Sequence, residues 1–424
     1  MPETVCLRAF GDAVCALLLT DAENSDIMDA ESKNGGDCMK IVIAADSFKG
    51  SLSSAEAGQA AAAGILRAMP DADIRVYPVA DGGEGTAEAL VSGLHGAYRT
   101  VPVSDPLGRP VPARYGILPD GTAVIEMAAA SGLPLLTESE RNPMHTTTYG
   151  FGELIADAVQ QGCRRFLLGI GGSATNDCGI GCLQALGFGF LDADGHQVSF
   201  GAAGLAQVQQ ISTDSIIPEL RECEFRVACD VRNPLCGESG CSRIFAPQKG
   251  ADPDMVSDME QSMRRFADLV RSEIPDADDA LPGSGAAGGL GFALRIFLHA
   301  VLSPGIETVI RMTGLESAIR SANAVVTGEG RLDAQTVLGK VPAGIAVAAK
   351  RYGIPVIAFC GCAGDGAAVC NQHGIDAYFP ILRGITSAAD AMQPDAAKQN
   401  LADTAEQVFR LYACALRRPH PQPV

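Results

Sequence analysis

The sequence predicts an α/β protein of two domains, in which a second α/β domain is inserted into a discontinuous, Rossmann-like parallel-sheet domain. Apolar strands alternate with helices at both ends of the chain, whereas the middle shows a hairpin-like pattern rich in proline. The length of 424 residues also favours two domains. We therefore expect an N-terminal extension over 1–38, the parallel-sheet domain over 39–95 and 285–418, and the inserted domain over 96–284.

Both ends of the chain carry the alternation that is typical of a parallel sheet. Lys40–Ala45 is a continuous apolar run of the buried-strand type, and Ser53 or Ser54 can cap the alanine-rich helix that follows. The remaining elements predicted for this domain are, in order, helices over 55–69 and 86–92 with a strand over 74–80 between them, a helix over 290–302, a strand over 324–327, a helix over 342–352, strands over 355–359 and 377–381, and a final amphipathic helix over 396–416.

The middle of the chain follows a different pattern. Five prolines lie between Val101 and Gly121, and Pro119-Asp-Gly121 has the chemistry of a hairpin turn. A helix over 149–161 and strands over 165–169 and 225–229 are predicted further along. These elements indicate a separate domain, and the cleft between two domains is a common place for a substrate.

Charge and composition exclude several classes of protein. The net charge of −18 argues against nucleic acid as a partner, because binding to a phosphate backbone needs a basic face. A small nucleotide substrate stays possible. No apolar run approaches the ~18 residues of a membrane span, so we expect no membrane partner. The fourteen cysteines match no zinc spacing and indicate small buried residues in a reducing, cytoplasmic compartment.

The first 38 residues differ from the rest of the chain. The apolar run Ala13–Leu19 is short, and an acidic stretch rich in glycine and asparagine follows it before Met39. The match to a signal peptide is weak. We interpret this stretch as a flexible extension, or as a misassigned start with the true one at Met39.

A glycine-rich loop follows the strand predicted over 165–169. It reads Gly169-Ile-Gly-Gly-Ser-Ala-Thr-Asn-Asp177 and leads into a segment with helical spacing. Glycines let the backbone approach an anion closely, and the N-terminus of a following helix also favours negative charge. The loop therefore predicts an anion site, and the alternative is an ordinary strand-to-helix turn.

Four predicted strand ends stop on acidic, polar turns. They are Asp46-Ser-Phe-Lys49, Asp81-Gly-Gly-Glu84, Asp230-Val-Arg-Asn-Pro234 and Glu329-Gly-Arg-Leu-Asp333. In an open α/β sheet, the carboxyl ends of the strands face the ligand crevice. Acidic residues at these ends can hold Mg²⁺ or act as a base toward a substrate hydroxyl, and the alternative is simple helix capping.

Three lysines stand beside glycines, namely Lys49, Lys249 and Lys340. We expect their ammonium groups to extend from loops. In an acidic protein such lysines suit the recognition of a carboxylate or a phosphate, and the alternative is a solvated surface position.

Two familiar nucleotide motifs are not matched. Gly283–Gly288 has the spelling of a dinucleotide fingerprint, but it follows a loop rather than a strand, so we interpret it as a close-packed loop that opens the next helix. Gly339-Lys340 lacks the upstream glycine of a Walker A sequence, and the protein-kinase signatures are missing.

Taken together, these segments resemble the bacterial glycerate kinase family (type I, glycerate 2-kinase-like). The matching pieces run in family order from Met39 to about residue 415: Ala45–Leu52, Pro78–Thr86, Asp105–Arg109, Gly169–Asp177, Asp230–Leu235, Gln248–Ala251, Gly285–Gly291 and Thr327–Asp333. The resemblance implies ATP-dependent phosphorylation of D-glycerate to 2-phosphoglycerate, with an active site between two α/β domains. It leaves the oligomeric state open.

The resemblance and the residue chemistry together give hypothetical roles. Phosphoryl transfer depends mainly on positioning and on charge neutralisation. The nucleotide phosphates are assigned to Gly171, Gly172, Ser173, Thr175, Asn176 and Asp177, and Mg²⁺ to Asp333 and Glu329. The catalytic set is Asp230, Lys49 and Asp46, with Asp230 as the favoured base, and the substrate set is Ser47, Asp81, Glu84, Arg109 and Lys249.

Two rival functions belong to other classes. An NAD-dependent 2-hydroxy-acid dehydrogenase would rest on Gly283–Gly288 and predicts binding of nicotinamide. A non-catalytic sugar-acid-binding protein predicts binding of glycerate without consumption of ATP. An assay that follows release of ADP separates both from a kinase.

Overall fold

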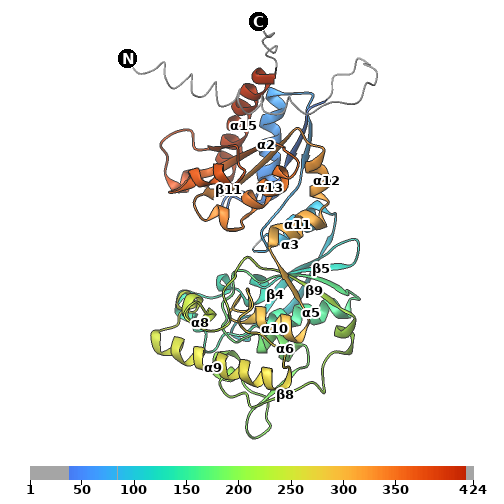
Figure 1. Cartoon of the computed structure of the whole chain (residues 1–424), viewed down its shortest axis with the longest axis vertical. Helices are drawn as coiled ribbons and strands as arrows, with labels where there is room; N and C mark the ends of the chain where they lie inside the picture. Colours follow the sequence, from blue (N-terminus) through green and yellow to red (C-terminus); the bar gives the residue numbers. More distant parts are fainter. Residues whose placement is uncertain (1–37, 84, 417–424) are drawn as a thin grey trace.

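The computed structural model describes residues 38–83 and 85–416. Figure 1 shows two lobes stacked along the long axis of the molecule. The upper lobe contains both the first and the last described elements, and helices α2 (Ser54–Ala68) and α15 (Pro394–Leu416) pack side by side in it. The two lobes and the discontinuous upper sheet confirm the fold class predicted from the sequence.

The upper sheet has five parallel strands in the order β13-β12-β11-β1-β2. Its strands are β1 (Lys40–Ile43), β2 (Asp73–Val76), β11 (Ala324–Leu332), β12 (Val356–Ala363) and β13 (Ala377–Pro380). Strand alternation divides β1 between two cores: Ile41 and Ile43 face α2 and α15, whereas Val42 faces the opposite core. The first helix begins with a capping box, in which Ser53 and Glu56 bond each other's backbone N–H groups.

The lower sheet has six strands in the order β10-β9-β6-β5-β4-β3. Its strands are β3 (Ala97–Ser104), β4 (Pro110–Ile117), β5 (Thr122–Glu126), β6 (Arg165–Gly169), β9 (Glu224–Ala228) and β10 (Val301–Ser303). The pairs of β4 with β3 and β5 are antiparallel, and the remaining pairs are parallel. A small pair, β7 (Gly189–Leu191) and β8 (Gln210–Ser212), lies apart from this sheet.

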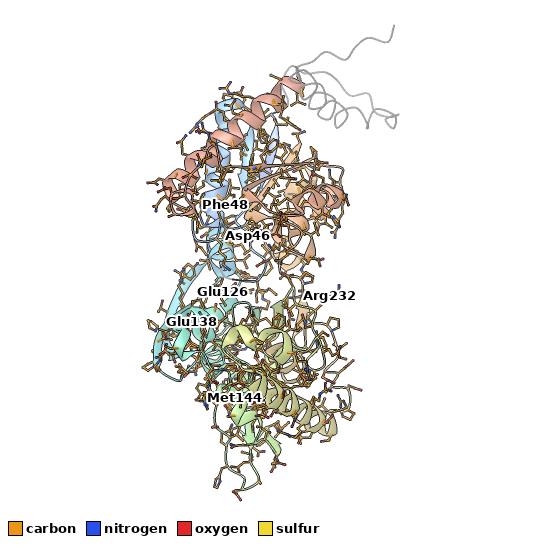
Figure 2. All side chains as sticks on the ribbon, turned by 90° about the vertical axis from the view of Figure 1, so that its left-hand side faces the viewer. Asp46, Phe48, Glu126, Glu138, Met144 and Arg232 are labelled. Carbon is orange, nitrogen blue, oxygen red and sulfur yellow. The ribbon has the colours of Figure 1, made fainter. Side chains whose placement is uncertain are left out.

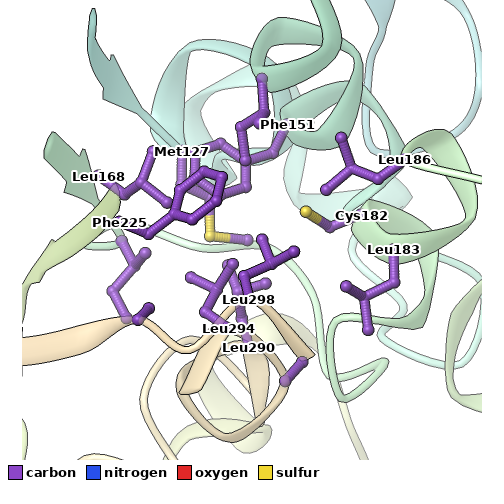
Figure 3. Packing of buried hydrophobic residues seen from close by; sticks show 14 of the residues in the cluster. Met127, Phe151, Leu168, Cys182, Leu183, Leu186, Phe225, Leu290, Leu294 and Leu298 are labelled. Carbon is purple, nitrogen blue, oxygen red and sulfur yellow. The ribbon is translucent and has the colours of Figure 1, made fainter. Parts of the chain in front are cut away.

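Helices cover both faces of the lower sheet. One face packs against the core of Figure 3, to which Phe151, Leu183 and Leu294 contribute. The helices of the lower lobe are α4 (Ala128–Ser131), α5 (Tyr149–Gln160), α6 (Ile180–Ala185), α7 (Gly201–Leu205), α8 (Cys241–Phe245), α9 (Pro253–Glu273) and α10 (Leu290–Phe297). The other helices are α3 (Thr86–Gly93), α11 (Gly305–Met312), α12 (Leu315–Arg320), α13 (Val341–Lys350) and α14 (Ala388–Ala391).

The lobes share an apolar core at their junction. Helices α3 and α11 lie between the lobes in Figure 1, and Leu90 of α3 packs with Val124 and Leu167 of the lower sheet. This core continues to Val42 in the upper sheet. Because the shared core is apolar and continuous, the carboxyl ends of the two sheets are held close together.

Two expectations from the sequence are wrong in detail. The inserted segment extends to Ser303 instead of ending at residue 284, because β10 pairs with β9 and Leu290 and Leu294 of α10 lie in the lower core. Strand β11 continues through Leu332 instead of ending at Thr327. Glycines at 328 and 330 interrupt the apolar pattern, yet they allow close approach of β12, which pairs with β11 from Val325 to Glu329 and again at Arg331 and Leu332.

Within the described ranges, no helix combines the length and apolar character needed to cross a membrane.

Candidate active site

Acidic residues from both sheets meet at the junction of the lobes. Asp46 and Asp81 follow strands β1 and β2 of the upper sheet, and Asp230 follows β9 of the lower sheet. Figure 2 shows Asp46 at the lower margin of the upper lobe, with Glu126 and Arg232 at the facing margin of the lower lobe. The parallel arrangement brings these strand ends to one place, as the sequence predicts.

Asp46 lies in a crowded acidic environment. Burial, together with the nearby charges of Asp81 and Glu329, raises the pKa of its carboxyl to about 7, although the Ser47 N–H bond lowers it. The Ser47 N–H donates to Asp46 Oδ1 at 2.7 Å. Asp46 and Ser47 also line a small cavity of about 40 Å³ beside Gly85. A carboxyl group with a pKa near neutrality can exchange protons or accept a cation.

Glu329 is a buried strand residue with two polar partners. The Thr336 hydroxyl donates to Glu329 Oε1, and Lys340 Nζ lies 3.4 Å from Glu329 Oε2. Burial nevertheless raises the pKa of Glu329. Asp333 is more peripheral, since its carboxylate pairs with Arg331 at 3.3 Å and accepts the Gln335 N–H. Glu329 is therefore better placed than Asp333 to serve a common site with Asp46.

Asp230 bridges the two lobes. Its Oδ1 accepts the N–H of Gly305 at the start of α11, at 3.2 Å. Gly339 of the upper lobe approaches the same carboxylate, because a Cβ at Gly339 would lie 3.8 Å from Asp230 Oδ1. Burial raises the pKa of Asp230 to about 6, opposed by the Gly305 hydrogen bond and assisted by the charge of Asp81.

Glycine backbones bring the phosphate-loop candidate to this acidic group. A Cβ on Gly169 would lie 2.6 Å from the carbonyl oxygen of Gly82, and a Cβ on Gly171 would lie 3.2 Å from Gly83 Cα. Gly171 and Gly172 are exposed, and the side chain of the following Ser173 is mostly buried. The exposed backbone of the loop thus begins directly beside the segment that follows Asp81.

The later residues of the loop face the protein interior. Asn176 Nδ2 donates to Ser242 Oγ at 2.9 Å, and both residues are fully buried. Asp177 is also fully buried, and it accepts hydrogen bonds from the N–H and hydroxyl of Thr148 and from the N–H of Gly179. Asn176 thus holds the loop against α8 and Asp177 holds it against the starts of α5 and α6, whereas Gly171 and Gly172 are the residues open to a ligand.

The three lysines that neighbour glycines have three different environments. Lys49 is exposed, as expected for a loop lysine, and its backbone N would lie 3.3 Å from a Cβ on Gly330. Lys340 is half-buried against Glu329. The expectation of an extended side chain is wrong for Lys249, which is only 2 % exposed because it lies beneath the glycine loop.

Arg109 lies at the outer end of the same sheet edge. Its turn joins β3 to β4, and its guanidinium contacts Asp105 and Glu140, each at 2.6 Å. Strand β3 runs parallel to β5, so the turn is on the side of Glu126, but β4 separates the two strands. Glu84, another predicted substrate residue, lies outside the described residues.

Sequence reasoning missed one residue at the junction and the partner of another. Glu126 ends β5 in register with Gly169, and its Oε1 accepts the N–H of Ala87 in the first turn of α3. For Lys340 the sequence indicates only general recognition of a carboxylate or a phosphate, and its contact with Glu329 was missed. The signal for Glu126 was its position as an acid directly after the apolar run that forms β5.

The segment Gly283–Gly288 supports the glycine loop. It precedes α10 and follows a loop, as the sequence indicates. A Cβ on Gly288 would lie 2.2 Å from the carbonyl oxygen of Thr175, so the two glycine-rich segments pack backbone to backbone. This packing, without a preceding strand, does not match a dinucleotide fingerprint.

In the described part of the chain, one group of three acids and histidines has ligand atoms close enough to one another to hold a metal ion. It comprises Asp192, Asp194 and His196 on a turn of the lower lobe. Asp192 Oδ1 already accepts the N–H groups of Asp194 and His196, so the group is explained as a polar turn.

The comparisons with known proteins agree on one family. The model of the glycerate kinase family matches residues 41–413. Glycerate 2-kinase of Escherichia coli (strain K12) is 45% identical over 380 residues, covering 89% of this chain and 99% of that protein. Glycerate kinase of Bacillus subtilis (strain 168) is 47% identical over 356 residues, covering 84% and 93%.

A solved structure gives the same result in three dimensions. The crystal structure of a protein assigned as glycerate kinase 2 from Salmonella typhimurium LT2 superposes with a TM-score of 0.82 and 43% identity. The match covers 90% of this chain and all of that one. With nearly the whole described chain matched in both sequence and structure, the protein belongs to the glycerate kinase family and is a kinase.

Proposed function

We propose that the protein transfers the γ-phosphoryl group of ATP to D-glycerate, giving 2-phosphoglycerate and ADP at the junction of the lobes. Membership of the family and the name of the Escherichia coli relative, glycerate 2-kinase, support this activity. The observation that carries the proposal is the convergence of Asp46, Asp81 and Asp230 beside the exposed glycines at 171 and 172. A phosphoryl acceptor and a polyphosphate can both be bound there.

The glycine loop is proposed to bind the nucleotide phosphates through its backbone. Gly172 has a φ of +73°, which favours glycine, and the open backbone at Gly171 and Gly172 lets phosphate oxygens approach the N–H groups. Ser173 supplies a hydroxyl next to them. Asn176 and Asp177 then act by shaping the loop, since their side chains bond into the interior.

The acidic group fits Mg²⁺ bound together with a nucleotide. Asp46 has a raised pKa partly because Asp81 and Glu329 repel its charge, and a divalent cation would relieve this repulsion. Mg²⁺ usually takes one or two carboxylates and completes its coordination with water and phosphate oxygens. Asp46 and Glu329 are the residues that would hold it, with Asp333 behind Glu329. Bound Mg²⁺ would neutralise the charge of the phosphate oxygens.

Asp230 is proposed as the general base toward the glycerate hydroxyl. Its raised pKa, about 6, leaves it ionised but still basic near neutral pH. The Gly305 N–H orients Oδ1, and the carboxylate lies between the lobes where an acceptor can meet the loop. Lys49, which is exposed beside Ser47, is proposed to hold the carboxylate of glycerate, and Lys340 to stabilise the transferred phosphoryl group.

The Asp230→Asn variant tests the assignment. It keeps the size of the side chain but removes the base, so we expect kcat to fall by about 10²- to 10⁴-fold. ADP release should be followed with glycerate, glycolate, lactate and tartronate, and the product identified by direct coupling to enolase, which accepts 2-phosphoglycerate. Nearly full turnover of the variant would remove Asp230 from this role. Absence of glycerate-dependent ADP release by the wild type would contradict the proposed function.

A further inference from the structure

A lysine ammonium is buried beneath the glycine loop without a carboxylate partner. Lys249 Nζ donates to Ser173 Oγ at 2.8 Å and to the carbonyl oxygen of Thr175 at 2.6 Å. Both acceptors are neutral, and the side chain is almost fully buried. Among the described residues, no acidic group lies within ion-pair distance of Nζ. The direct contacts of the positive charge are therefore neutral dipoles, with the carboxylate of Asp177 farther away.

Such a charge is unfavourable unless something compensates it. Burying an ammonium group away from water has a large desolvation cost, which an opposite charge normally offsets. Nearby polar atoms are also unmatched: Thr175 Oγ1, Asn176 Oδ1 and Ser131 Oγ are buried without hydrogen-bond partners. Ser131 belongs to the same site, because its carbonyl oxygen accepts the N–H of Ala174 in the loop. The buried positive charge and these polar atoms without partners together indicate that the loop binds a negatively charged ligand.

We propose that Lys249 is a positioning residue for the polyphosphate of the nucleotide: it fixes Ser173 and Thr175 from below and supplies the positive charge that balances an anion on the exposed face of the loop. The inference rests on the proposed kinase function. It assigns Lys249 to the nucleotide rather than to glycerate, because a fully buried side chain beneath the loop cannot reach a second substrate.

The surroundings of Lys249 make this charge sensitive to pH. Burial lowers the pKa of Lys249 to about 8, and the opposing effects of Cys241 from α8 and Asp177 from the loop are smaller. These are the titratable groups that face the ammonium. A bound polyphosphate favours the protonated form, so affinity for the nucleotide should fall as the pH rises through about 8.

Calorimetric titration of ADP in the presence of Mg²⁺, without glycerate, tests the inference. At about pH 7, Lys249→Met should weaken ADP binding by about tenfold or more, the range seen when charge-assisted hydrogen bonds are lost. Lys249→Gln keeps a hydrogen-bond donor for Ser173 but removes the positive charge. It therefore separates the effect of the hydrogen bond from the effect of the charge. The control is Lys398→Met, which removes an exposed lysine paired with Glu56 in the upper lobe.

The pH profile supplies a second measurement that needs no variant. Wild-type affinity for ADP should fall between about pH 7 and pH 9, while the Lys249→Met profile should lack this fall. Equal ADP affinity in wild type and Lys249→Met, or a wild-type affinity independent of pH, would overturn the inference while leaving the kinase function intact. A wild type that neither binds ADP nor phosphorylates glycerate would instead contradict the proposed function, and this inference with it.

Discussion

Lys340 Nζ lies 3.4 Å from Glu329 Oε2, where the residue before α13 meets strand β11. The preceding residue, Gly339, approaches Asp230 of the lower lobe. The segment Gly339-Lys340 thus places an ammonium group next to Glu329 of the upper sheet. It also places the backbone of Gly339 next to Asp230 of the lower lobe. A positive charge in this position can stabilise the negative charge of a phosphoryl group in transfer.

The first prediction concerns this ammonium group. Lys340→Met should lower kcat for glycerate by about 10²-fold, because one fixed cation near the reacting phosphoryl group would be lost. Folding stability should fall only modestly, since the pair is long, Lys340 is partly exposed, and buried Glu329 keeps the Thr336 hydroxyl as a partner. Steady-state kinetics and urea unfolding measure the two effects.

Lys350→Met is the matched control on the same helix. Lys350 ends α13 and pairs with Asp376 on the surface, away from the acidic junction. Its kinetics should equal those of the wild type. Equal kcat values for the two variants would rule out a role of Lys340 in the transfer.

The sequence predicted the strand ends of the site better than their surroundings. Asp46 and Asp230 could be placed because each follows a predicted strand, with only Arg226 interrupting the apolar run before Asp230, and parallel strands bring such ends together. The burial of Lys249 could not be predicted, because its partners Ser173 and Thr175 come from a distant segment of the chain. The extension of β11 also escaped prediction, since its glycines are permissive and carry no apolar signal.

The second prediction links activity to stability at Asp46. Its pKa is raised from 3.8 to about 7, so the folded state binds the proton more tightly than the unfolded state does. The contribution of this group to stability is therefore most favourable below about pH 4 and falls as the pH rises to about 7. Asp46→Asn removes this penalty, and its upper limit is about 4 kcal/mol at about pH 8.

Urea unfolding in metal-free buffer measures this difference at two pH values. The Asp46→Asn variant should be more stable than the wild type at about pH 8, and this gain in stability should be smaller at about pH 5. Its kinase activity should be strongly reduced at both pH values. Asp71→Asn, an exposed acid of the same lobe, serves as the control. A variant that is less stable than the wild type at about pH 8 would contradict the raised pKa of Asp46.

The third prediction tests the backbone contact between the lobes. Gly82 has a φ of +90°, and an added Cβ would lie 2.4 Å from Ala228 Cβ at the end of β9. Gly82→Ala should therefore reduce the free energy of unfolding by about 2 kcal/mol or more and lower kcat/KM. Gly121→Ala is the control, because its φ of +81° is similar but open space surrounds it. Equal losses of kcat/KM in both variants would show that the lobe contact has no special importance for activity.

The fourth prediction decides what Arg109 does. Its guanidinium is held by Asp105 and Glu140 at the outer end of the sheet edge, and the side chain is about half exposed. We expect Arg109→Ala to reduce stability by up to about 1 kcal/mol by loosening the turn between β3 and β4, since buried Asp105 keeps the backbone N–H groups of residues 107 and 109 as partners. The KM for glycerate should then stay within about threefold of the wild type, since a loosened turn at the edge leaves the acidic junction in place.

Glu140→Gln should reproduce the small stability loss, because it weakens the same turn without removing the cation. If Arg109→Ala alone raises the KM for glycerate by a factor of about ten or more, which is about 1.4 kcal/mol of binding, the guanidinium contacts the substrate and its two carboxylates only orient it.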